Sequence, residues 1–264
     1  MMLFTTLKTA TAVVVLDMVQ VGNLGNPVDL AGGNFGSVNY EYQIGKYPIT
    51  IAQYAEFLNA VAANDIYALY DANLATNLNI VGIKQNGATG SYSYSVQDNS
   101  GYSGNRPITY INWWRACRFT NWMANGQPTG AQDSKTTEDG TYTLSGAVSG
   151  NAKPINSINP NTGKTPLYYI AREDEWYKAA YYNAQSQTYT RFATQSNEIP
   201  GNVISSKPNQ VNYINPESLM CTTQSTELLT GVVNYLTDVG AFTASASYYG
   251  TYDQCGNVWE VGSC

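Results

Sequence analysis

The stretch Tyr40-Glu41-Tyr42-Gln43-Ile44-Gly45-Lys46-Tyr47-Pro48-Ile49-Thr50 leads without a gap into Ile51-Ala52-Gln53-Tyr54-Ala55-Glu56-Phe57-Leu58-Asn59-Ala60-Val61. Thr50 is a favourable N-cap, and Gln53 follows three residues later, where its amide can reach back to the N-cap backbone. The stretch therefore predicts a helix that begins after Thr50. Apolar residues then recur at a spacing that places them on one helical face. The predicted buried face consists of Ile51, Tyr54, Ala55, Leu58, Val61 and Ala62.

Two further helices have clear start or stop signals. One begins after Asn112, a good N-cap, and ends at Asn125-Gly126, with Pro128 just beyond. The other covers about 173–182 and carries three carboxylates in its first turn, where the helix dipole favours negative charge. Those carboxylates (Glu173 to Glu175) could instead form an acid–base cluster, but the dipole explains them without chemistry.

Short strands and long loops are expected between the helices. Residues 13–21 are rich in β-branched side chains and predict a first strand. Residues 92–96 alternate polar and apolar side chains and predict a half-exposed strand. Residues 138–144 predict a turn followed by a strand. Residues 145–165 and 184–232 are rich in Asn, Ser, Gly and Pro and show little periodicity. So much irregular chain needs support, for which bound calcium and buried polar networks are two candidates. The pattern indicates a loop-rich α+β domain.

Composition excludes several classes of function. The chain of 264 residues carries a net charge of −6 and no block of basic residues, which argues against nucleic-acid binding. It contains no histidine, so every Ser-His or Cys-His nucleophile pair and the commonest metal ligand are excluded. No segment is long and apolar enough to span a bilayer.

The cysteines give no support for a zinc site, because Cys117, Cys221, Cys255 and Cys264 are scattered and form no C-x-x-C pair. Cys117 lies within the second predicted helix beside apolar residues, which favours a role as a small core side chain. Cys255 and Cys264 are close enough in sequence to close a short loop, but the sequence does not establish their pairing.

The N-terminal residues 1–16 allow two interpretations. They resemble a poor signal peptide, with one lysine, a short apolar stretch and no small-residue cleavage site, or they lead into the first strand. We expect residues 17–264 to form one domain.

Several motifs in a fixed order resemble the formylglycine-generating enzyme family, also called sulfatase-modifying factors. They include the opening stretch 40–61, Arg106-Pro107-Ile108 before Asn112-Trp113-Trp114, the helix start Glu173-Asp174-Glu175-Trp176, and Gly256-Asn257-Val258-Trp259-Glu260. The resemblance covers about 17–260, and its branch is common in secreted bacterial proteins. It therefore implies a secreted or extracytoplasmic protein, which the polar, Tyr-rich composition also favours.

The resemblance implies an elaborated C-type-lectin-like fold that is held partly by calcium. Asn257 and the backbone at Val258 resemble part of one calcium site, and Asn212 resembles a contributor to another. The alternative is that both asparagines merely satisfy turn geometry. Two other positions depart from the family: Ala171-Arg172 replaces Pro-Ser before the third helix, and Val261 replaces a Trp.

The family's enzymes convert a sulfatase cysteine to formylglycine with molecular oxygen and copper held by two thiolates. Those cysteines follow the Gly-Asn-Val-Trp-Glu motif, and neither Cys255 nor Cys264 matches them. We therefore assign no catalytic residue, expect no copper, and predict a non-catalytic module that binds a protein or carbohydrate ligand. The alternative is an incomplete copy of the copper-dependent oxidase, because only four residues follow Glu260. An open apolar groove beside the motif would favour this alternative, and a closed surface would favour a self-sufficient binding domain.

Overall fold

The computed structural model describes residues 13–223 and 233–263 and shows a loop-rich α+β architecture. Its strands form three separate two-stranded antiparallel sheets, β1 with β2, β3 with β4 and β5 with β6. The elements are β1 (Met18–Val21), β2 (Tyr42–Gly45), α1 (Ile51–Val61), α2 (Asn73–Thr76), β3 (Ile83–Asn86), β4 (Ser93–Val96), a 3-10 turn η1 (Ser103–Asn105), α3 (Trp113–Ala124), α4 (Glu173–Tyr181), β5 (Tyr182–Asn183) and β6 (Thr188–Tyr189).

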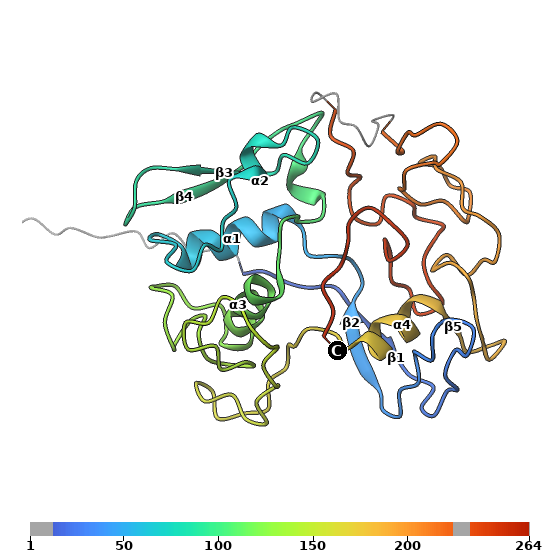
Figure 1. Ribbon diagram of the computed structural model, residues 1–264, viewed down its shortest axis with the longest axis horizontal. Helices are drawn as coiled ribbons and strands as arrows, with labels where there is room; N and C mark the ends of the chain where they lie inside the picture. Colours follow the sequence, from blue (N-terminus) through green and yellow to red (C-terminus); the bar gives the residue numbers. More distant parts are fainter. Residues whose placement is uncertain (1–12, 224–232, 264) are drawn as a thin grey trace, which may run out of the picture.

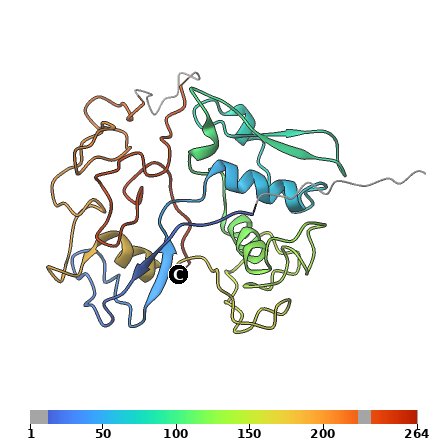
Figure 2. The ribbon, with the colours of Figure 1, turned by 180° about the vertical axis from the view of Figure 1, so that it is seen from behind.

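The molecule has two halves with the last residues of the chain between them. Figure 1 shows α1, α2, α3 and the β3–β4 hairpin on one side, and β1, β2, α4 and β5 on the other. The C-terminal segment runs between these two groups, and the view from behind in Figure 2 shows the same order. Residues near the end of the sequence therefore lie at the centre of the fold.

Helix α1 confirms the opening prediction. The Thr50 hydroxyl accepts a hydrogen bond from the Gln53 N–H at 3.3 Å, and the Thr50 N–H donates to the Gln53 side chain at 2.9 Å. These two bonds are the reciprocal capping box expected from the sequence. The predicted face of α1 is buried in the largest apolar cluster, together with Phe119 and Trp122 of α3.

Helices α3 and α4 also begin and end close to their predicted positions. The Asn112 side chain caps α3 by accepting from the Arg115 N–H at 2.9 Å. At α4 the Arg172 side chain makes no cap bond, because a guanidinium has no acceptor. The Glu175 carboxylate instead accepts from the Arg172 N–H at 2.8 Å, so one half of a capping box remains.

The first strand is shorter than predicted. Only Met18–Val21 pair with Tyr42–Gly45, and residues 13–17 are not in a strand. The N–H and C=O of Val14 bond instead to the side chain of Gln127, each at 2.7 Å. A side-chain amide thus takes the place of a partner strand.

The strand predicted within 138–144 was wrong, whereas the one within 92–96 is confirmed as β4. The Asn121 side chain of α3 binds both the N–H and the C=O of Tyr142, each at 2.8 Å. Tyr142 is fully buried, so these bonds satisfy its backbone inside the core and leave no need for a strand ladder. The partner of β4, Ile83–Asn86, was not predicted.

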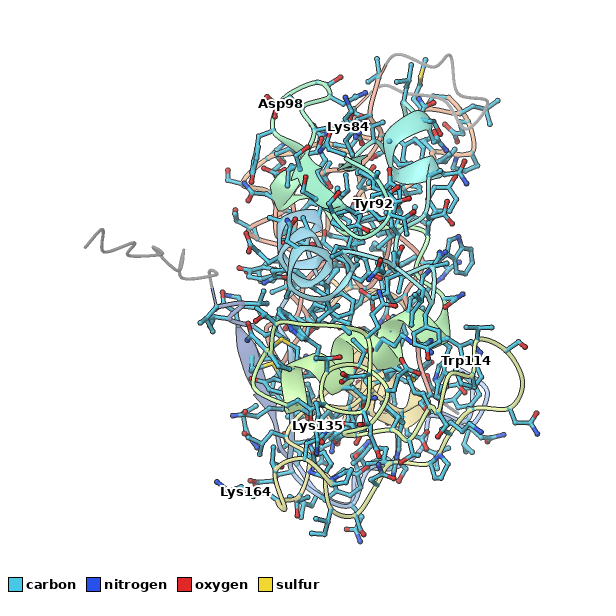
Figure 3. All side chains as sticks on the ribbon, turned by 90° about the vertical axis from the view of Figure 1, so that its left-hand side faces the viewer. Lys84, Tyr92, Asp98, Trp114, Lys135 and Lys164 are labelled. Carbon is cyan, nitrogen blue, oxygen red and sulfur yellow. The ribbon has the colours of Figure 1, made fainter. Side chains whose placement is uncertain are left out.

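Polar side chains hold the long loops, which confirms one of the two expected supports. Asp139 accepts from the Thr143 hydroxyl at 2.8 Å, and Asn156 donates to the carbonyl of Gly140 at 3.0 Å. Asn159, fully buried, donates to the Asn125 side chain at 2.9 Å. In Figure 3 Lys135 and Lys164 of these loops lie at the opposite end of the molecule from Lys84, so these three lysines do not form one basic patch.

A second, smaller core lies beneath α3. Cys117 is completely buried there, as predicted, and packs with Trp114 and Tyr142. Beside it Arg118 and Glu138 form an ion pair whose side chains are only 1% and 7% exposed. This core anchors the loops of 138–147 to the helix.

Candidate functional site: a central groove

A groove with a volume of about 1590 Å³ lies between the two halves. Its walls come from both halves and from the C-terminal segment. The lining is rich in apolar and aromatic side chains, among them Ile44, Ile49, Ile108, Phe119, Trp176 and Leu236. An open groove of this kind is the feature that would favour the incomplete-oxidase alternative, and it also provides a binding site.

The margin of the groove carries unusually exposed apolar side chains. Trp259 is 102% exposed and Leu167 is 84% exposed, and both line the groove. Isolated exposed apolar residues are ordinary, but a tryptophan with no packing partner at the edge of an apolar groove is a common feature of binding surfaces. Trp259 was not singled out from the sequence, because nothing in the pattern distinguishes an exposed Trp from a core Trp.

The C-terminal segment is anchored through the backbone of Ser263 and the side chain of Glu260. Ser263 donates its N–H to the Ala171 carbonyl at 2.9 Å and accepts from the Glu173 N–H at 3.0 Å. Trp176 donates its indole N–H to the Glu260 carboxylate. Among the described residues, no hydrogen bond uses the backbone N–H or C=O groups of residues 259–262.

The three carboxylates at the start of α4 do not form an acid–base cluster. Glu175 is buried and accepts from the hydroxyls of Tyr40 at 2.7 Å and Tyr169 at 2.9 Å. Asp174 accepts from the Gly36 N–H at 2.7 Å. Glu173 is exposed and lines the groove, as the buried Glu175 does, whereas Asp174 does not. The three carboxylates thus have separate surroundings, which agrees with the helix-dipole interpretation.

Glu260 also lines the groove, together with Glu173 and Glu175. The surrounding walls raise the pKa of its carboxyl, and Asp253 nearby raises it further, while the bond from Trp176 lowers it. The residue as a whole is exposed, but its carboxyl group is the part that the walls surround. A cation bound in the groove would favour the ionised form of Glu260.

The described cysteines do not fit a copper dithiolate. Cys117 lies in the core, and burial raises the pKa of its thiol. Cys221 shares a hydrogen bond with the Thr223 hydroxyl at 3.2 Å. The Cys255 sulfur accepts from the Ala193 N–H at 2.8 Å, and burial raises the pKa of this thiol too. Cys264 lies outside the described residues, so the structure does not test whether it pairs with Cys255.

The structure brings together the asparagines predicted to bind calcium. Asn257 has a positive φ of 68°, and its side-chain oxygen accepts from the Asn212 amide at 3.2 Å and from the Thr237 N–H at 3.1 Å. The Asn212 oxygen accepts from the Thr222 N–H at 3.2 Å. These oxygens face N–H donors and do not fit a calcium ion as arranged. The positive φ of Asn257 agrees with a turn, whereas Asn212 bonds to residues remote in the sequence. Calcium at Asn257, Asn212 and the Val258 backbone stays a prediction.

The Gly256 backbone explains why the motif begins with glycine. A Cβ at Gly256 would collide with the carbonyl oxygen of Asn212, which also accepts the Asn257 N–H at 2.8 Å. The motif therefore fastens the start of the C-terminal segment to residue 212, and Trp259 follows on the exposed side.

In residues 13–223 and 233–263 we find no helix with the length and hydropathy of a membrane span. The family model described as "Sulfatase-modifying factor enzyme 1-like domain" matches residues 36–263. No curated protein and no solved structure matches the chain.

Proposed function

Because the chain belongs to the sulfatase-modifying factor enzyme 1-like family, we propose that it is a binding module whose central groove holds an elongated ligand and that it does not itself carry out the oxidation known from the family's enzymes. The observation that carries this proposal is that the sulfur atoms of Cys221 and Cys255, the two described cysteines that line the groove, are each bonded to a separate partner. The groove supplies the binding site. At about 1590 Å³ it is larger than the roughly 300–1,000 Å³ typical of small-molecule pockets. Its size and apolar lining suit a long ligand.

The state of the thiols supports a role without copper chemistry. Copper-dependent oxidation in this family needs two thiolates that approach one metal ion, and Cu(I) prefers soft sulfur ligands. Burial keeps Cys117 and Cys255 in the neutral thiol form by raising their pKa values. The sulfur atoms of Cys221 and Cys255 are already engaged with separate partners.

A lectin-like scaffold would agree with this proposal, because loops then carry the binding surface and short elements position it. We infer the lectin-like arrangement from the family resemblance and from the loop-rich α+β architecture. Calcium would add to such a scaffold only if the Asn257 and Asn212 amides turned away from their present donors.

An oxidation assay tests the proposed function. The 264-residue protein is loaded with copper, supplied with oxygen and reductant, and incubated with a cysteine-containing sulfatase-motif peptide. We expect no aldehyde product by mass spectrometry. Copper-dependent turnover would contradict the proposal.

A second candidate is the formylglycine-generating oxidase itself, and the openness of the groove is the observation in its favour. The groove has room for a polypeptide segment that carries the thiolate pair. Reading the nucleotide sequence downstream in all frames tests this candidate. An Arg- and Gly-rich continuation with paired cysteines would support it, and its absence would remove it.

A further inference from the structure

We propose that Asn86-Gly87, in the turn between β3 and β4, is a site of spontaneous covalent modification, at which the asparagine amide becomes a carboxylate through a cyclic succinimide. The site lies outside the central groove, and the inference does not depend on the proposed binding function. The sequence contains one other Asn-Gly pair, Asn125-Gly126, and the two pairs have different surroundings in the fold.

The reaction requires only base and water. Base removes the proton of the Gly87 N–H, the nitrogen attacks the side-chain carbonyl carbon of Asn86, and the side-chain nitrogen leaves as ammonia when the succinimide ring closes. Water then opens the ring at either of its two carbonyl carbons and leaves an aspartate or an isoaspartate. Glycine favours ring closure, because it has no side chain beside the attacking nitrogen and its backbone is permissive. Asparagine is a thermolabile residue in proteins for this kind of reason.

The turn exposes the pair and requires its glycine. Figure 1 shows the β3–β4 hairpin projecting from its half of the molecule, and residues 87–91 are all exposed. Gly87 has a φ of 89°, and a Cβ at this residue would lie 2.7 Å from the Ser91 carbonyl oxygen. Only glycine therefore fits this turn without strain, so the same residue that shapes the hairpin leaves the attacking nitrogen unhindered.

The atoms that react in Asn86-Gly87 are weakly held. Within the described residues, the Gly87 N–H donates no hydrogen bond, so the attacking nitrogen is open to base. The Asn86 side-chain nitrogen donates to the Lys84 carbonyl at 3.4 Å and to the Ser95 hydroxyl at 3.2 Å. Both distances are at or beyond the long end for such hydrogen bonds, and both contacts are exposed. Little therefore opposes rotation of this amide toward the nitrogen of Gly87.

Asn125-Gly126, by contrast, is fixed at the end of α3. The Gly126 N–H is bonded to a carbonyl of the last helical turn at 3.1 Å. The Asn125 side-chain nitrogen donates to the carbonyls of Thr136 and Asp139, at 3.1 Å and 2.8 Å, and its oxygen accepts from the Asn159 amide at 2.9 Å. Ring closure here first requires these bonds to open, and the free energy of that opening slows the reaction.

The modification alters the turn and leaves the strands paired. An isoaspartate lengthens the backbone at residue 86 by one methylene. Beyond the turn, the Gly90 N–H donates to the Ala63 carbonyl at 2.9 Å and fixes the chain there, so residues 87–89 take up the added length. Either product adds one negative charge to a chain that already carries −6, and places it on the same face of β3 as Lys84.

Ageing of the folded 264-residue protein tests this site. The protein is held at mildly alkaline pH and physiological temperature and is then digested with trypsin, which leaves the two pairs on separate peptides, 85–115 and 119–135. Tandem mass spectrometry measures conversion at each asparagine, and an unaged sample corrects for conversion during digestion. We expect Asn86 to convert about tenfold faster than Asn125 or more. An isoaspartyl methyltransferase should label the product at residue 86.

Two controls separate the effect of the fold from that of the local sequence. In guanidinium chloride, where neither pair is held by the fold, Asn86 and Asn125 should convert at similar rates. Asn86→Gln should abolish conversion at residue 86 and leave Asn125 unchanged, because ring closure from glutamine would require a larger ring. Equal conversion of the two asparagines in the folded protein, or an Asn86 that stays intact, would overturn the proposal. A difference that persists in guanidinium chloride would overturn it as well, since the fold would then not be its cause.

Discussion

Arg118 shows what a single residue does in a fold with so little regular structure. Its guanidinium donates to both oxygens of Glu138, at 2.6 Å and 2.9 Å, and to the Ala147 carbonyl at 3.0 Å. The ring of Tyr67 lies 4.2 Å from the guanidinium carbon. One buried side chain thus ties α3 to two loops, where a larger sheet would use ladder hydrogen bonds.

Glu138→Gln should strongly destabilise the protein. It leaves the buried Arg118 charge without its counter-charge, for which we expect a loss of about 3 kcal/mol in the free energy of unfolding. Urea denaturation followed by Trp fluorescence measures this. Asp71→Asn is the control, because the Arg115–Asp71 pair is partly exposed and should contribute about 1 kcal/mol or less. If both variants lose the same free energy of unfolding, burial of the Arg118–Glu138 pair does not increase the cost of removing its carboxylate.

Asn257 permits a direct test of the calcium prediction. Its side-chain oxygen already accepts two N–H bonds, so we expect the same Tm in EDTA and in millimolar calcium. An ion present at about 100 times its Kd would add about 2.7 kcal/mol of stability. A calcium-dependent rise in Tm that Asn257→Ala removes would instead establish calcium at this turn.

At the scale of elements, the residues that determine where each helix begins lie next to that helix in the sequence. Thr50, Asn112 and the carboxylates after Arg172 each mark a helix start within a few residues, which is why α1, α3 and α4 could be predicted. The one departure is Arg172, which occupies an N-cap position in an extended conformation and has no side-chain acceptor to offer.

Arg172→Ser should therefore stabilise α4. The serine hydroxyl would accept from the free N–H at the start of the helix, and we expect a gain of about 0.5–1 kcal/mol in the free energy of unfolding. Thermal unfolding measures the change. Thr50→Ala at α1 is the converse variant, with an expected loss of about 1 kcal/mol. If Arg172→Ser lowers the Tm, the Arg172 guanidinium stabilises the folded protein by more than a serine N-cap hydrogen bond would.

The strands were harder to predict, because their partners are remote in sequence or are not strands. Gln127 satisfies Val14, and Asn121 satisfies Tyr142, in each case through a side chain more than twenty residues away or on another element. Periodicity carries no signal for such bonds. For the same reason the groove margin was missed: Trp259 and Glu173 belong to motifs read from the sequence, but their meeting at one groove depends on the whole fold.

At the scale of the whole molecule, the groove separates two halves that share the C-terminal segment. Trp259 belongs to neither core, since it is fully exposed. Trp259→Ala should therefore leave the free energy of unfolding unchanged within about 0.5 kcal/mol, as expected for a surface substitution. Trp122→Ala, in the core beneath α1, should cost about 3–5 kcal/mol in the same urea experiment. A large loss for Trp259→Ala would mean that this side chain packs against the protein.

Fluorine NMR of protein labelled with 5-fluorotryptophan tests the central claim most directly, because each of the five tryptophans gives one signal and Trp variants assign them. The cysteine-containing sulfatase-motif peptide of the oxidation assay is titrated into the labelled protein. The account predicts that the signals of Trp259 and Trp176, which line the groove, shift with a common Kd, while those of Trp113, Trp114 and Trp122 stay in place. An unchanged Trp259 signal at saturating peptide would contradict the groove as the binding site.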